Sequence, residues 1–137
     1  MEREEMLAKV EAAYDARRTG DFDALRKLAA EDAAFTTAGE QSLVRVLPGA
    51  GGVTVHQAAE ELFKAIELRS LDVVEAVAEG NRIAILWRTT AAVGDGEPFE
   101  TLMFDLWEFD SSGKIARGTQ FVDTARFLQE MQQPAKA

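Results

Sequence analysis

Cysteine is absent from the 137-residue chain, histidine occurs once and proline three times. Without cysteine there is no disulfide framework and no thiolate ligand for zinc, a composition that fits a reducing compartment such as the cytoplasm. With a single histidine, a metal site would depend on several carboxylates, and no spacing of acidic residues suggests one. We therefore expect neither a metal nor another cofactor.

Positive charge and long apolar runs are also scarce. Lysine and arginine number 15 against 24 acidic residues, which gives a formal net charge of −9 at pH 7. Such a chain would repel a phosphate backbone, so we do not expect nucleic-acid binding. No apolar run approaches the roughly 18 residues that span a bilayer, and the charged start at residues 1–5 does not resemble a signal peptide. We expect a cytoplasmic protein with no membrane partner.

Helical patterns occupy the first half of the chain. Apolar residues recur with helical spacing over residues 3–19, and Gly20 follows where a C-terminal capping glycine would stand. Asp21 is placed to cap a second helix. Thr54 and Gln57 form a capping box that begins a third helix.

Strand patterns with hairpin turns occupy the second half. A short strand over residues 33–37 precedes four apolar segments separated by turn residues, at 71–78, 83–93, 99–109 and 115–122. A last short helix is predicted at residues 124–132. Leu, Ile, Val and Phe account for 34 residues, enough for the core of a single domain spanning residues 1–137. Helices segregated from strands predict an α+β fold, with helices packed on one concave face of an antiparallel sheet.

The third of these four segments is apolar on both faces. Leu102, Phe104 and Leu106 alternate along it with Met103 and Trp107. The helices can cover one face, but the chain has no further elements to cover the other. A second copy of the chain is the simplest cover, so we expect a homodimer. The alternative is an outer sheet face that remains partly exposed.

Two stretches resemble a known superfamily. Residues 14–25, followed by Glu31-Asp32-Ala33, resemble the opening of NTF2-like proteins, and residues 110–117 through 121–123 resemble their last hairpin and strand. The SnoaL-like and ketosteroid-isomerase-like branches are the most similar. The resemblance implies a cystatin-like cone of helices on a curved sheet around an apolar pocket, usually dimeric. Members include isomerases, polyketide cyclases, epoxide hydrolases, dehydratases and non-catalytic binding modules, so the fold alone does not assign a function.

Asp105 is the strongest candidate for a catalytic residue. It lies between Met103 and Trp107 on an apolar strand, where a carboxylate is costly unless it is paired, neutralised or solvated. Burial would raise its pKa and could keep it protonated as a hydrogen-bond donor. By resemblance, it falls on the position of the oxyanion-hole acid of ketosteroid isomerases. The alternative is a structural aspartate, bonded to a Thr, Gln or Tyr or facing the dimer side.

Tyr14 and His56 complete the catalytic candidates. By resemblance, the isomerase general base corresponds to Thr37 and the oxyanion-hole tyrosine to Ala13, with Tyr14 one residue later. One residue on a helix is about 100° of rotation, so Tyr14 reaches the pocket only if the helix register differs. His56 lies in the first turn of the third helix, where the helix dipole favours its neutral form and hence a role as a base. The alternative for His56 is a solvent-exposed side chain.

The remaining candidates are expected to line the pocket. Bulky side chains would form the walls of the pocket, and uncharged polar side chains would contact the polar atoms of the ligand. By resemblance, Thr89 and Gln120 stand at the two acidic positions of the epoxide-hydrolase branch. These ligand-binding candidates are Thr37, Phe63, Trp87, Thr89, Met103, Trp107 and Gln120. The set predicts an acid–base isomerase, cyclase or dehydratase acting on a small apolar carbonyl or enol compound. The alternative is a non-catalytic ligand-binding or dimerisation module of the same fold.

Overall fold

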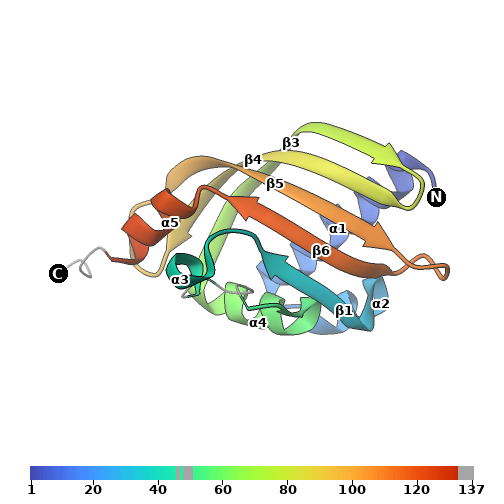
Figure 1. Ribbon diagram of the computed structural model, residues 1–137, viewed down its shortest axis with the longest axis horizontal. Coiled ribbons are helices and arrows are strands. Elements are labelled where there is room, and N and C mark those ends of the chain that lie inside the picture. The colour runs from blue at the N-terminus through green and yellow to red at the C-terminus, as the bar shows by residue number, and fades with distance from the viewer. Residues whose placement is uncertain (46, 48–50, 133–137) are drawn as a thin grey trace.

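The computed structural model describes residues 1–45, 47 and 51–132. A six-stranded curved sheet, in the order β2–β1–β6–β5–β4–β3, crosses the molecule (Figure 1). The strands are β1 (Ala29–Thr37), β2 (Val53–Thr54), β3 (Ile66–Glu79), β4 (Arg82–Val93), β5 (Phe99–Phe109) and β6 (Ile115–Val122). The expected α+β cone is confirmed.

One strand pair departs from the expected antiparallel sheet. β1 runs parallel to β6, and the sheet is therefore mixed. The hairpin turns predicted from the sequence govern only β3 to β6, which are consecutive in the chain. β1 and β6 are far apart in the sequence, so no local turn determines whether they pair in parallel or antiparallel.

Helices α1 (Arg3–Thr19), α2 (Phe22–Leu28) and α4 (Val55–Ala65) cover one face of the sheet, whereas α3 (Gln41–Val44) and α5 (Thr124–Met131) lie near one end of it (Figure 1). Local signals set their limits as predicted. Gly20 ends α1 in the left-handed conformation, with φ of 76°. The Asp21 side chain accepts from the backbone of α2, and Thr54 and Gln57 form both halves of a capping box at α4. None of the described helices has the length and apolarity to cross a membrane.

The curvature of the sheet places the interior under these helices. β3 begins directly after α4 and contains two register shifts in its pairing with β4, between Leu68 and Ser70 and between Val73 and Glu75. Such bulges bend a strand and increase its twist. Along β5, Met103, Asp105 and Trp107 are buried beneath the helices, and the residues between them face outward.

Candidate functional site

A buried carboxyl group lies at the centre of the interior. Asp105 has no exposed surface, and its Oδ2 accepts hydrogen bonds from three side chains. These are the Tyr14 hydroxyl, the Trp87 indole Nε1 at 2.9 Å and the Trp107 indole Nε1 at 3.1 Å. The other oxygen, Oδ1, is buried and has no partner among the described residues. Oδ2 therefore accepts three hydrogen bonds, whereas Oδ1 accepts none from the described residues.

Strand register and one glycine bring the indoles to this carboxyl. Trp107 stands two residues along the same strand, and Trp87 lies on β4, opposite Met103. The Trp107 ring lies over Gly118 of β6, its neighbour across the sheet. A Cβ atom at Gly118 would approach the ring to 2.3 Å, so the missing side chain makes room for the indole. Gly118 therefore leaves room for the Trp107 indole, and the N–H groups of both indoles are directed at Asp105.

The environment favours protonated forms of two groups. Burial raises the pKa of Asp105, although the hydrogen bonds from Tyr14, Trp107 and Trp87 act in the opposite direction. Burial, followed by the proximity of Asp105, raises the pKa of Tyr14 well above its ordinary value. Tyr14 therefore holds its proton at neutral pH, and Asp105 is displaced toward the neutral acid.

Two small cavities adjoin this cluster. One, of about 40 Å³, lies among residues of α1, α2, α4, β1 and β5, and is bordered by Tyr14, Trp107 and Gln120. The other, of about 20 Å³, is bordered by Thr37, Met103 and Gln120. Gln120 Nε2 donates to the Tyr14 hydroxyl oxygen at 2.8 Å. Sites for drug-sized ligands measure about 300–1,000 Å³, so side chains must move outward before such a molecule enters.

Several predicted site residues come together here. Tyr14 contacts Asp105 directly, so the register of α1 does bring it to the carboxyl. Trp87, Trp107 and Gln120 complete the cluster, while Asp105 itself lies behind the side chains that border the cavities. Thr37 and Met103 border the smaller cavity only.

Other predicted residues lie elsewhere. His56 Nε2 is 3.0 Å from the carbonyl oxygen of Ala30, and the side chain borders a surface groove rather than either inner cavity. Phe63 borders neither inner cavity: it is 47% exposed, packs edge-on against Phe22 and borders an outer groove. Thr89 is buried, but its hydroxyl donates to the backbone oxygen of Ser70. Among the described residues, no three histidine or acidic side chains gather as a metal would require.

The sequence interpretation missed Arg17, which borders both inner cavities. Its side chain is 7% exposed, and burial lowers its pKa to about 10, so it is still a cation at neutral pH. A signal was available: Arg17 follows Tyr14 by three residues, and residues at that spacing share a helix face. A charged residue continuing the apolar stripe of α1 could have been recognised as a pocket residue.

Comparisons with known proteins agree with this architecture. The SnoaL-like domain family matches residues 10–118, whereas no curated protein matches the chain. An NTF2-like protein of unknown function from Burkholderia pseudomallei is similar in structure, with a TM-score of 0.76 at 19% identity over 94% of this chain and 98% of that one. An LEH-like epoxide hydrolase of M. tuberculosis has a TM-score of 0.69 at 14% identity, covering 95% and 91%. TerC, crystallised with polyporic acid, has a TM-score of 0.71 at 16% identity, covering 94% and 99%.

Proposed function

The chain belongs to the SnoaL-like domain family, and from this premise we propose that it is an acid catalyst that isomerises, cyclises or dehydrates a small apolar carbonyl or enol compound. One observation carries the proposal: a fully buried carboxyl is hydrogen-bonded to a tyrosine that borders a cavity. Structural neighbours that include an epoxide hydrolase and a protein crystallised with polyporic acid support a small organic molecule as the ligand.

The proton path runs from Asp105 through Tyr14. In the structure the Tyr14 O–H donates to Asp105 Oδ2. When a ligand carbonyl enters, this hydrogen bond reverses: neutral Asp105 donates to the Tyr14 oxygen, and the Tyr14 O–H donates to the carbonyl oxygen of the ligand. Negative charge that develops on that oxygen is then stabilised by a fixed donor in a site with little water. Gln120 holds the Tyr14 oxygen in place from the side. Among the described residues, no Asp, Glu or His borders either inner cavity, so removal of a proton from carbon falls to water.

Exchange of α-protons for deuterium tests this chemistry without knowledge of the natural substrate. Acetophenone and 2-tetralone are incubated with the protein in D₂O, and proton NMR follows the loss of their α-proton signals. Tyr14→Phe and Asp105→Asn should each slow the exchange by about 10²-fold or more, the usual contribution of a general acid. His56→Gln is the matched control, because this side chain lies outside the inner cavities, and it should keep the parent rate.

A non-catalytic binding module is the second candidate. The observation in its favour is that Trp87, Trp107 and Tyr14 all donate to Oδ2 of Asp105, which has no exposed surface. In that case the carboxyl orders the aromatic cluster, and the pocket only holds a ligand. Ketones that raise the melting temperature of the protein but exchange no α-protons would favour this function over catalysis.

The outer face of the sheet is proposed to pair two copies of the chain. Leu102, Phe104 and Phe121 lie exposed on β5 and β6, at 49%, 45% and 53%, and Phe104 stands opposite Phe121 in the strand register. Neighbouring exposed apolar side chains of this size favour burial against a second copy. Sedimentation equilibrium at high micromolar concentration should give twice the mass of the 15.0 kDa chain, and a single 15.0 kDa species would refute the pairing.

A further inference from the structure

A buried arginine without an ion pair borders the interior spaces of the molecule. Within the described part of the chain, Arg17 makes one side-chain hydrogen bond, from Nη2 to the carbonyl oxygen of Ile66 at 3.3 Å, and no ion pair. A guanidinium carries several further N–H donors. Burying a cation is costly unless an anion compensates it, so this side chain lacks its natural partner.

Arg17 stands where three spaces meet. It borders the cavities of about 40 Å³ and 20 Å³ and also an outer groove of about 270 Å³, and among the described residues it alone borders all three. Tyr14 precedes it by one helical turn, and Gln120 borders both inner cavities. An anion beside Arg17 would therefore also lie close to the Tyr14–Gln120 hydrogen bond.

Asp105 does not serve as the counterion of Arg17. Its Oδ2 is occupied by Tyr14 and the two indoles, and it forms no ion pair with the guanidinium. Among the described residues of α1, only Tyr14 is hydrogen-bonded to the Asp105 carboxyl. Tyr14 and Asp105 act on the guanidinium through space and raise its pKa, but neither is bonded to it, so N–H donors of Arg17 remain open to a ligand.

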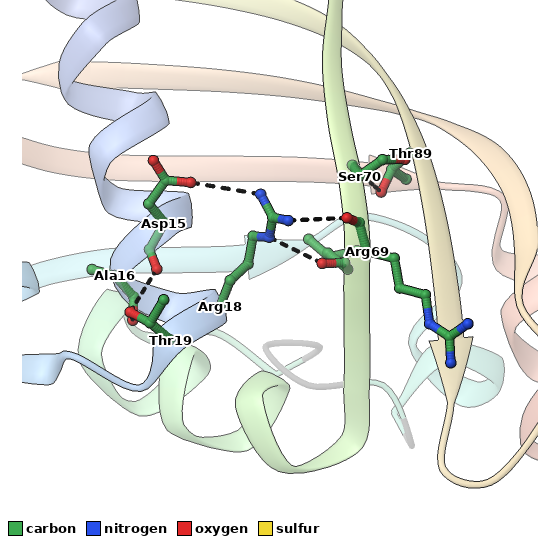
Figure 2. A network of polar contacts seen from close by, with 8 residues as sticks. Asp15, Ala16, Arg18, Thr19, Arg69, Ser70 and Thr89 are labelled. Carbon is green, nitrogen blue, oxygen red and sulfur yellow. Dashed lines mark hydrogen bonds and ion pairs between the residues drawn. The ribbon is translucent and has the colours of Figure 1, made fainter.

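The outer groove is also cationic. Besides Arg17 it is bordered by Arg18 and Lys64, against one acidic residue, Glu67. Figure 2 shows Arg18 reaching from α1 to the backbone of β3, where it donates to the carbonyl oxygens of Leu68 and Arg69 at 3.0 Å each. Arg18 also forms an ion pair with Asp15 at 3.6 Å, so the unpaired positive charge at this groove comes from Arg17 and Lys64. Lys64 has no hydrogen bond or ion pair within the described part of the chain. On a protein of net charge −9, such a groove locally favours the approach of an anion.

We propose that Arg17 binds the anionic group of the ligand, so that this pocket takes up a small organic acid, held as its carboxylate or enolate. This inference rests on the proposed function, because it names the ligand class of the same pocket. The planar guanidinium matches a carboxylate through paired N–H donors, which a neutral carbonyl compound cannot use as fully. The apolar body of the acid lies against Phe35, Leu62 and Trp107, which border the larger cavity.

Matched acids and amides provide the test. Benzoate is compared with benzamide, and trans-cinnamate with trans-cinnamamide, by calorimetric or ligand-observed NMR titration at pH 7. We expect the parent protein to bind each acid about tenfold or more tightly than its amide, because a hydrogen-bonded charge is involved. Arg17→Met should bring this ratio close to one. Lys27→Gln removes one positive charge from an exposed position of α2 and should keep the ratio.

Three results would overturn the inference: equal affinity for acid and amide, an acid preference that survives in Arg17→Met, or no binding of the acids at millimolar concentration. If Arg17→Met does not fold, Arg17→Lys decides, because it keeps the charge and loses the planar fork. It should lower the acid-to-amide ratio, and an unchanged ratio would also overturn the inference.

The two proposals fail separately. Acid preference without α-proton exchange would leave the ligand class standing and remove the catalytic function. α-Proton exchange that depends on Tyr14 and Asp105, together with equal binding of acid and amide, would support the catalytic function and remove the proposed ligand class.

Discussion

Replacing Asp105 by asparagine tests the charge state of the buried carboxyl with little change of shape. The asparagine oxygen can accept from the three donors that now converge on Oδ2, namely Tyr14, Trp87 and Trp107. Its NH₂ group then occupies the place of Oδ1, which has no partner among the described residues. The variant therefore keeps the hydrogen bonds that the structure shows at Oδ2 and removes the ionisation.

The sign of the effect follows from the pKa of Asp105, which burial raises above the unfolded value of about 3.9. Between these two pKa values, the native state holds a proton that the unfolded chain has released. The stabilisation from this group is complete below the unfolded pKa and is lost as pH rises toward the folded pKa. The free energy of unfolding of the parent therefore falls by about 1.4 kcal/mol for each pH unit in this interval. Asp105→Asn lacks this loss, so its stability relative to the parent should rise with the same slope.

Urea unfolding at a series of pH values from 4.5 to 8, followed by tryptophan fluorescence, measures the difference between the two proteins. Effects of the overall charge cancel in that difference. Asp110→Asn is the control, because hydrogen bonds from Ser112 and Lys114 lower the pKa of Asp110, so its difference from the parent should stay constant over this pH range. Its stabilisation is present above the unfolded pKa and is lost as pH falls. If the difference between Asp105→Asn and the parent instead stayed constant over this pH range, Asp105 would be an ionised structural carboxylate and the reasoning would be refuted.

Two further substitutions test the packing of the sheet. Gly118→Ala places a Cβ within 2.3–2.7 Å of three atoms of the Trp107 ring, so it should destabilise the protein by about 1–3 kcal/mol in urea unfolding and alter the near-UV circular dichroism. Gly51→Ala, with no atom within 4 Å, is its control, and an equal effect of both would contradict the packing argument. If the proposed dimer forms through this face, Phe104→Glu should make the protein a monomer in sedimentation equilibrium without loss of secondary structure, because it places a charge beside Phe121 on the apolar surface to be buried. A variant that remains dimeric would place the interface elsewhere.

The sequence by itself determined the elements whose causes are local. A glycine after a helical stripe, as at Gly20, and a capping box, as at Thr54 and Gln57, fix helix ends through hydrogen bonds between near neighbours. Hairpin turns fix the pairing of consecutive strands in the same way, so β5 and β6 were predicted with their observed limits. The alternation along β5 also singled out Asp105 as a carboxyl on an apolar strand, although it did not decide whether the residue faces the interior or the outer side.

Only the tertiary structure decided what depends on distant segments. The parallel pairing of β1 with β6 has no local signal, and neither does the contact between Tyr14 and Asp105, which are 91 residues apart. Whether a helical side chain meets a strand depends on the rotation and position of the whole helix, which packing sets. The same packing buries Arg17 between the cavities and leaves His56 outside them, although both lie on helices that cover the sheet. Residue type and spacing thus fixed which groups could act, and the docking of α1 and α4 decided which of them meet.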